Sequence, residues 1–191
     1  MGLDMYLERC QREAWGYRNV DILQVKEDNA ELYETIKPYL HVRGSEALKW
    51  DSIFEGVGYW RKANAIHRWF VDNVQDGYDD CGYYEVTKEQ LEELLGICNT
   101  IITEIKMKHG RVTNGSTYAN GIWCPNIEEG DVVVNPEIAQ ELLPTQAGFF
   151  FGSTDYDQWY MQNIADTIEI LTKTLKETDF NKQMIVYTSS W

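Results

Sequence analysis

Hydrophobic and polar positions alternate at the start of the chain, where Leu3, Met5 and Leu7 are separated by polar or aromatic residues. A period of two is typical of a β-strand. Near the other end, residues 184–188 contain the β-rich run Ile185-Val186-Tyr187. We therefore predict that the two ends of the chain pair in one small antiparallel sheet.

Most of the chain between these ends has the three- and four-residue spacing of amphipathic helices. The clearest helix is predicted over 88–108, because Thr87 and Gln90 form a capping box before a continuous apolar stripe. A last long helix, capped by Ser153 or Thr154, is predicted to end near Lys176. Shorter helices are predicted over 28–36, 45–54 and 58–74, with Gly77 closing the last of these.

Residues 111–147 have a different character. Asn114-Gly115 and Asn120-Gly121 are turn signals. The run 132–134 predicts a short strand, and Asn135-Pro136 predicts the start of a short helix. Phe149-Phe150-Phe151 is typical of a buried strand or a pocket wall. These elements together predict a helix-rich α+β fold, and the absence of a linker or repeat favours one domain over 1–191.

The net charge of the chain restricts the kinds of binding partner that we expect. The chain carries 31 acidic and 17 basic residues, which gives a net charge of −14. Non-specific nucleic-acid binding and adhesion to anionic membranes need clustered Lys and Arg, so we expect neither. Solubility alone, a basic protein partner and mimicry of a nucleic-acid surface are all compatible with this charge. Aromatic residues make up 13% of the chain, which is compatible with stacking pockets, protein interfaces or a homo-oligomer.

Motifs for common chemistry are missing. The four cysteines form no CxxC pair, and there is no HExxH, Walker or dinucleotide-binding motif. The sequence thus predicts no metal and no cofactor. No segment has the pattern of a signal peptide or the length of a membrane span, so we expect a cytoplasmic protein.

A basic, aromatic segment stands out in this acidic chain. No acidic residue occurs between Glu55 and Asp72. Arginine and lysine bind phosphate oxygens, and a nucleotide base can stack on an aromatic ring. The candidate ligand-binding residues are Arg61, Lys62 and Arg68 for phosphate, Tyr59, Trp60 and Trp69 for stacking, and Asn64 and His67 for hydrogen bonds to a base or ribose. The alternative is structural: these cations pair with acidic residues elsewhere and the aromatic residues form core.

A secondary candidate is the stretch around Ser153, Thr154 and Tyr156, where backbone N–H groups before a helix could hold an anion. Asp155 and Asp157 fit a capping role better. His67 with a carboxylate such as Glu55 or Asp72 could perform acid–base chemistry, although a packed histidine is the simpler reading.

Several stretches resemble a family of small uncharacterised proteins encoded by phages and prophages. They are Met1-Gly2-Leu3-Asp4-Met5-Tyr6-Leu7, the segment from Gly58 to His67, Leu142-Leu143-Pro144-Thr145, the segment from Gly148 to Tyr156, and Ser189-Ser190-Trp191. Residues 9–55 depart from the family pattern. The resemblance supplies no site residues. It implies an accessory, counter-defence protein that acts in the cytosol of a bacterial host.

Three hypotheses follow. The first is a protein that binds and sequesters a phosphorylated, nucleotide-derived host signal. The second is an acidic protein–protein inhibitor or DNA mimic that blocks a host immune protein. The third is a nucleotide phosphodiesterase or hydrolase. The missing catalytic motifs favour binding over catalysis.

Overall fold

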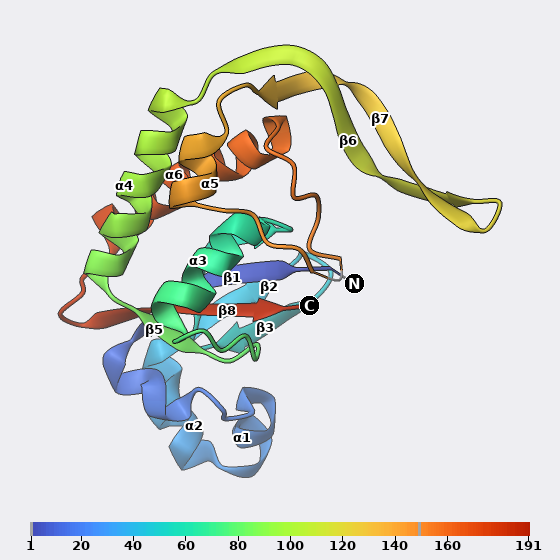
Figure 1. Ribbon diagram of the computed structural model, residues 1–191. Helices are drawn as coiled ribbons and strands as arrows, with labels where there is room; N and C mark the ends of the chain where they lie inside the picture. The colour runs from blue at the N-terminus through green and yellow to red at the C-terminus, as the bar shows by residue number, and fades with distance from the viewer. Residues whose placement is uncertain (1, 149) are drawn as a thin grey trace.

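A four-stranded antiparallel sheet, in the order β4-β1-β8-β5, forms the centre of the protein (Figure 1). The computed structural model describes residues 2–148 and 150–191. The strands are β1 (Asp4–Gln11), β4 (Glu55–Arg61), β5 (Tyr84–Val86) and β8 (Gln183–Ser190). The terminal strands β1 and β8 are the central pair, which confirms that the two ends meet in one sheet.

The α+β class is confirmed, but strands are not confined to the termini. Strands β4 and β5 come from the middle of the chain. Two further antiparallel hairpins lie outside the central sheet. They are β2 (His41–Gly44) with β3 (Lys49–Ser52), and β6 (Met107–Ala119) with β7 (Ile122–Val133).

Three helices cover one face of the sheet: α3 (Asn64–Val74), α4 (Lys88–Glu104) and α6 (Gln158–Glu177). The odd-numbered apolar residues of β1 and β8 point toward these helices because side chains alternate along a strand. The fully buried side chains of this core include Leu3, Met5, Leu7, Phe70, Leu94, Ile101, Ile164, Leu171, Ile185 and Tyr187. Burial on this scale is the main stabilising contribution to the fold.

The other face of the sheet is covered by the segment between β1 and β4. This segment contains η1 (Arg12–Tyr17), α1 (Ile22–Asp28), α2 (Ala30–Ile36) and η2 (Lys37–Tyr39). A second, smaller core joins Cys10, Met184 and Val186 of the sheet to Ile36 and Phe54. The helix predicted over 28–36 matches α2, whereas α1 was not predicted.

The capping box of α4 is confirmed: Thr87 Oγ1 accepts from the Gln90 amide N–H, and Gln90 Oε1 accepts from the Thr87 N–H. The helix ends at Glu104, however, and not at residue 108. Asn135 causes the early end, since its amide donates to the Glu104 carbonyl and accepts from the Lys106 N–H. This contact joins the end of α4 to the start of α5 (Glu137–Leu142), close to the helix start predicted at Asn135-Pro136.

The helix predicted over 58–74 is wrong in its first six residues and confirmed over 64–74. Residues up to Arg61 belong to β4, and the helix begins at Asn64. Pairing of residues 58–61 with β1 explains the difference, because it holds them extended. At Gly58, a Cβ would lie 2.5 Å from Cγ2 of Ile170 on α6. The glycine lets α6 approach the strand closely. Lys62, with φ of 60°, then turns the chain from strand to helix.

The helix predicted over 45–54 is also wrong, because 49–52 form β3. The Asn120-Gly121 turn is confirmed: both residues have positive φ and connect β6 to β7. Asn114-Gly115 instead lies at a bulge, where the register shifts between Thr113 and Ser116. Phe149 lies outside the described residues, and Phe151 is buried.

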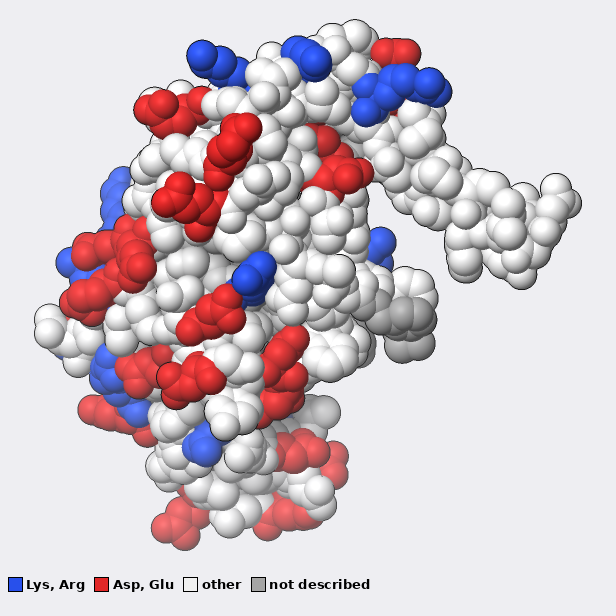
Figure 2. Space-filling model, in the orientation of Figure 1, with Lys and Arg blue, Asp and Glu red and all other residues white. Residues whose placement is uncertain are grey.

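The far part of the β6–β7 hairpin projects away from the body of the protein (Figure 1). We call residues 113–127 the arm. They include no Asp, Glu, Lys or Arg, so the arm is white in Figure 2, whereas acidic side chains are frequent over the body. Across residues 2–148 and 150–191, no helix is long and apolar enough to cross a membrane.

Candidate functional site

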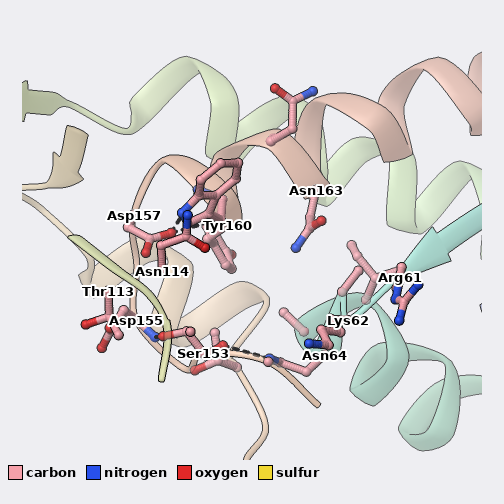
Figure 3. A pocket seen from close by; sticks show the side chains of 18 of the residues that line it. Arg61, Lys62, Asn64, Thr113, Asn114, Ser153, Asp155, Asp157, Tyr160 and Asn163 are labelled. Atoms are coloured by element: carbon pink, nitrogen blue, oxygen red, sulfur yellow. Dashed lines mark hydrogen bonds between the residues drawn. The ribbon is translucent and has the colours of Figure 1, made fainter. Parts of the chain in front are cut away.

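A pocket of about 480 Å³ lies where four segments of the chain meet. The turn from β4 to α3 forms one wall, and the first turns of α6 form another. Residues 113–116 of the arm and the loop before α6 complete it (Figure 3). Small-molecule sites commonly enclose roughly 300–1,000 Å³, so the pocket is large enough for a nucleotide-sized ligand.

Two cations from the predicted basic segment line this pocket. Arg61 is the last residue of β4 and Lys62 follows it at the turn. The Lys62 backbone N–H donates to the Leu3 carbonyl at 2.8 Å, which fixes the turn against β1. Both side chains are exposed, and neither forms an ion pair with any residue in the described ranges. They are therefore available to an anionic ligand.

Two carboxylates lie on the opposite side of the pocket from Arg61 (Figure 3). Asp157 is the N-cap of α6, and its Oδ1 accepts from the backbone N–H groups of Trp159 and Tyr160 at 2.8 and 3.2 Å. Its Oδ2 is buried without a hydrogen-bond partner among the described residues. Burial raises the pKa of the Asp157 carboxyl. An unsatisfied buried polar atom costs about 1–3 kcal/mol, so a water or ligand group that donates to Oδ2 would stabilise the site.

The remaining functional groups come from α6 and the loop before it. The Asp155 carboxylate is exposed and makes no hydrogen bond or ion pair with the described part of the chain. Trp159 is 45% exposed and offers an indole surface in the pocket. Asn163, four residues later, lies on the same side of the helix and also lines the pocket. The pocket thus combines cations, carboxylates, an amide and an aromatic ring.

Asn64 has a structural role in the site, and its side chain is not available to bind a ligand. Its amide donates to the carbonyls of Phe151 and Ser153 at 3.2 and 2.8 Å, and it accepts from the Gln146 N–H at 3.0 Å. The side chain is buried, and its hydrogen-bonding capacity is used within the protein. Asn64 therefore attaches the loop before α6 to the start of α3.

The three predicted stacking residues lie elsewhere. Trp60 and Trp69 are buried, at 3% and 5% exposure, and the Trp60 indole N–H donates to Thr167 Oγ1 at 2.9 Å. Tyr59 is half exposed on β4, outside the pocket lining, and its hydroxyl donates to Asp4. The exposed aromatic ring at the pocket is that of Trp159, beside the buried Tyr160. Trp60 lies in the core because of the strand conformation of β4.

His67 is fully buried and does not line the pocket. Its Nδ1 lies 2.7 Å from the Tyr187 hydroxyl and its Nε2 lies 3.0 Å from Asp79 Oδ2. Asp79 Oδ1 also accepts from the Trp191 indole N–H at 3.0 Å. Both ring nitrogens are engaged, so the histidine connects α3, the sheet and the end of the chain.

Arg68 is partly exposed and lies 3.4 Å from Asp72, one turn later on α3, outside the pocket lining. Neither of the two carboxylates considered as partners for catalysis, Glu55 and Asp72, hydrogen-bonds to His67, whose carboxylate partner is Asp79. Glu55 pairs with Arg9 at 2.8 Å, and Asp72 pairs with Arg68. The basic segment is therefore divided between the pocket and the surface of α3.

The secondary candidates lie in the loop before α6, and α6 is capped by Asp157 and not by Ser153 or Thr154. Ser153 lines the pocket. The Thr154 carbonyl accepts from Thr145 Oγ1 at 3.0 Å, and the Tyr156 hydroxyl accepts from the Thr145 N–H at 3.2 Å. Because the Asp157 carboxylate already occupies the helix N-terminus, an anion is disfavoured there.

Sequence reasoning missed Trp159, Asn163 and residues 113–116 as parts of the site. The spacing of four between Trp159 and Asn163 was a local signal, because it puts both side chains on one face of a helix. The contribution of the arm had no such signal. Within the described residues, no group of three or more His, Cys, Asp or Glu could hold a metal ion. Comparisons with protein-family models, with curated proteins and with solved structures found no match to this chain.

Proposed function

We propose that this protein binds a small phosphorylated, nucleotide-type ligand in the pocket at the start of α6. The observation that carries the proposal is the pair Arg61 and Lys62, both exposed to a cavity of about 480 Å³ and unpaired within the described chain. In a chain of net charge −14, two adjacent cations without acidic partners are suited to phosphate oxygens.

The exposed Trp159 indole supports a nucleotide over a simple phosphate. A base stacked on an aromatic side chain contributes about 1–3 kcal/mol to binding. The described residues that line the pocket include no histidine or cysteine, which favours binding over turnover. With the phage-like sequence features, we infer that the protein sequesters a nucleotide-derived defence signal of a bacterial host.

Calorimetric titration with mononucleotides, cyclic nucleotides and ADP-ribose-type compounds tests the proposal. We expect binding to at least one of them, and loss of that binding in the double variant Arg61→Glu/Lys62→Glu. Lys173→Glu is the matched control, because Lys173 is an exposed cation on α6 outside the pocket lining. Unchanged affinity in the double variant, or no binding to any compound, would contradict the proposal.

A second candidate is an acidic protein–protein inhibitor. Figure 2 shows acidic side chains over much of one face of the body, and the exposed residues of α4 include Glu89, Glu92 and Glu93. Such a surface fits a basic partner, with an association that weakens as salt rises. Capture of a host immune protein at low salt, unaffected by Arg61→Glu/Lys62→Glu, would favour this candidate over the first.

A further inference from the structure

The pocket has two electrically different ends. Arg61 and Lys62 lie on one side, and Asp155 and Asp157 lie on the other (Figure 3). A carboxylate repels a phosphate, so the phosphate of a bound ligand is directed to the cationic end. The group that reaches the other end must therefore be uncharged or cationic, and it must offer hydrogen-bond donors, because ionised carboxylates only accept.

The acidic end has acceptors that the protein leaves unused. Asp157 is only 2% exposed, and its Oδ2 has no donor among the described residues. Asp155 adds an exposed carboxylate whose two oxygens make no hydrogen bond or ion pair with the described chain. A capping role explains Oδ1 of Asp157, which accepts from two backbone N–H groups. It does not explain Oδ2 or Asp155.

We propose that the acidic end of the pocket selects a guanine-type base, whose edge presents a ring N–H beside an amino group; this inference rests on the proposed nucleotide-binding function. Two adjacent donors match the two oxygens of one carboxylate. Adenine and cytosine place an acceptor nitrogen beside their amino group, and that acceptor would face the carboxylate lone pairs. Uracil has a single N–H between two carbonyl groups.

The position of Trp159 supports this orientation. The residue lies two positions after Asp157 at the start of α6 and lines the same pocket. A base stacked on its indole can present its edge to the carboxylates, while the ribose and phosphate extend toward Lys62 and Arg61. One bound nucleotide then uses both ends of the pocket.

Titration of the unaltered protein with GMP, IMP and AMP tests the inference without any substitution. IMP differs from GMP only by lacking the amino group. We expect GMP to bind about ten-fold or more tightly than either IMP or AMP, because a site that hydrogen-bonds a donor strongly rejects the analogue that lacks it. Equal affinities for the three nucleotides, or a preference for AMP, would overturn the guanine assignment and leave the proposed nucleotide binding intact. No binding to any nucleotide would remove both.

The variant Asp155→Asn then tests whether Asp155 is the carboxylate that recognises the base. The amide presents one acceptor and one donor in place of two acceptors, so the preference for GMP over IMP should shrink several-fold. Glu169→Gln is the matched control, because it removes one exposed carboxylate from α6 outside the pocket lining. A full preference in Asp155→Asn would contradict recognition through Asp155.

Discussion

At the scale of single residues, the two carboxylate oxygens of Asp157 have opposite effects on the stability of the fold. Oδ1 stabilises α6 as its cap, whereas the buried Oδ2 lacks a partner among the described residues. Burial raises the pKa of this carboxyl above its ordinary value of 3.8. A raised carboxyl pKa means that the charged form is disfavoured in the folded state. The stability that protonation provides is complete below pH 3.8 and is lost as the pH rises through the folded-state pKa.

The substitution Asp157→Asn keeps the Oδ1 acceptor and removes the charge. We expect the ligand-free variant to be more stable than the parent protein by roughly 1 kcal/mol at neutral pH. The difference should disappear below about pH 3.8, where both side chains are neutral. Urea unfolding across this pH range measures it. A variant that is less stable than the parent at neutral pH, with equal stability below about pH 3.8, would show that the charged carboxylate stabilises the fold.

Trp159 and Trp60 have different expected roles, the first in nucleotide stacking and the second in core packing. Trp159→Ala removes an exposed ring, so we expect roughly ten-fold weaker nucleotide binding with an unchanged melting temperature. Trp60→Phe leaves a gap in the core and removes a hydrogen bond to Thr167, so stability should fall by about 1–3 kcal/mol. Calorimetry and thermal unfolding on both variants measure the two effects. Lost binding in Trp60→Phe at a temperature where it is folded would contradict this division.

At the scale of elements, the start of α4 is stabilised by its own side chains. Thr87→Ala removes one half of the capping box, and we expect it to lower the free energy of unfolding by about 1 kcal/mol. Thr100→Ala on the exposed face of the same helix is the control and should change stability by less than about 0.5 kcal/mol. Equal effects of the two substitutions in urea unfolding would argue against capping as the cause.

The same elements show what could be predicted from sequence. The capping box and the Asn120-Gly121 turn are local patterns, and both were predicted correctly. The conformation of 58–61 depends on pairing with β1, about fifty residues earlier, and on Ile170, more than a hundred residues later. The aromatic spacing that continues backward from α3 imitates a helix there. Local periodicity could not reveal either distant contact.

In the site, too, the features that depend on local sequence could be predicted and those that depend on distant contacts could not. Arg61 and Lys62 were identified because cations without acidic neighbours are visible within a short stretch. The carboxylate end was not identified as a ligand contact, because both Asp155 and Asp157 fit a helix-capping role in the sequence, although only Asp157 caps α6. The ligand contact that we propose for them depends on the pocket, which the arm, α3 and α6 form together. Trp60 was assigned to stacking because its burial is set by the strand and not by the local sequence.

At the scale of the whole molecule, the central sheet and the arm differ in how they are supported. Strands β1 and β8 lie between two cores, so their amide hydrogens should exchange only on global unfolding. The arm is a two-stranded hairpin whose residues from Gly115 to Gly121 are all exposed, and isolated hairpins are marginally stable in water. We expect rapid exchange along the arm.

Residues 113–116 line the pocket, so a bound nucleotide should slow exchange there and leave residues 118–124 unchanged. Hydrogen exchange measured by mass spectrometry, with and without GMP, resolves the two segments. Protection of 118–124 in the free protein would mean that another surface already covers the arm, and equal protection of both segments by GMP would mean that the arm closes over the ligand as one unit.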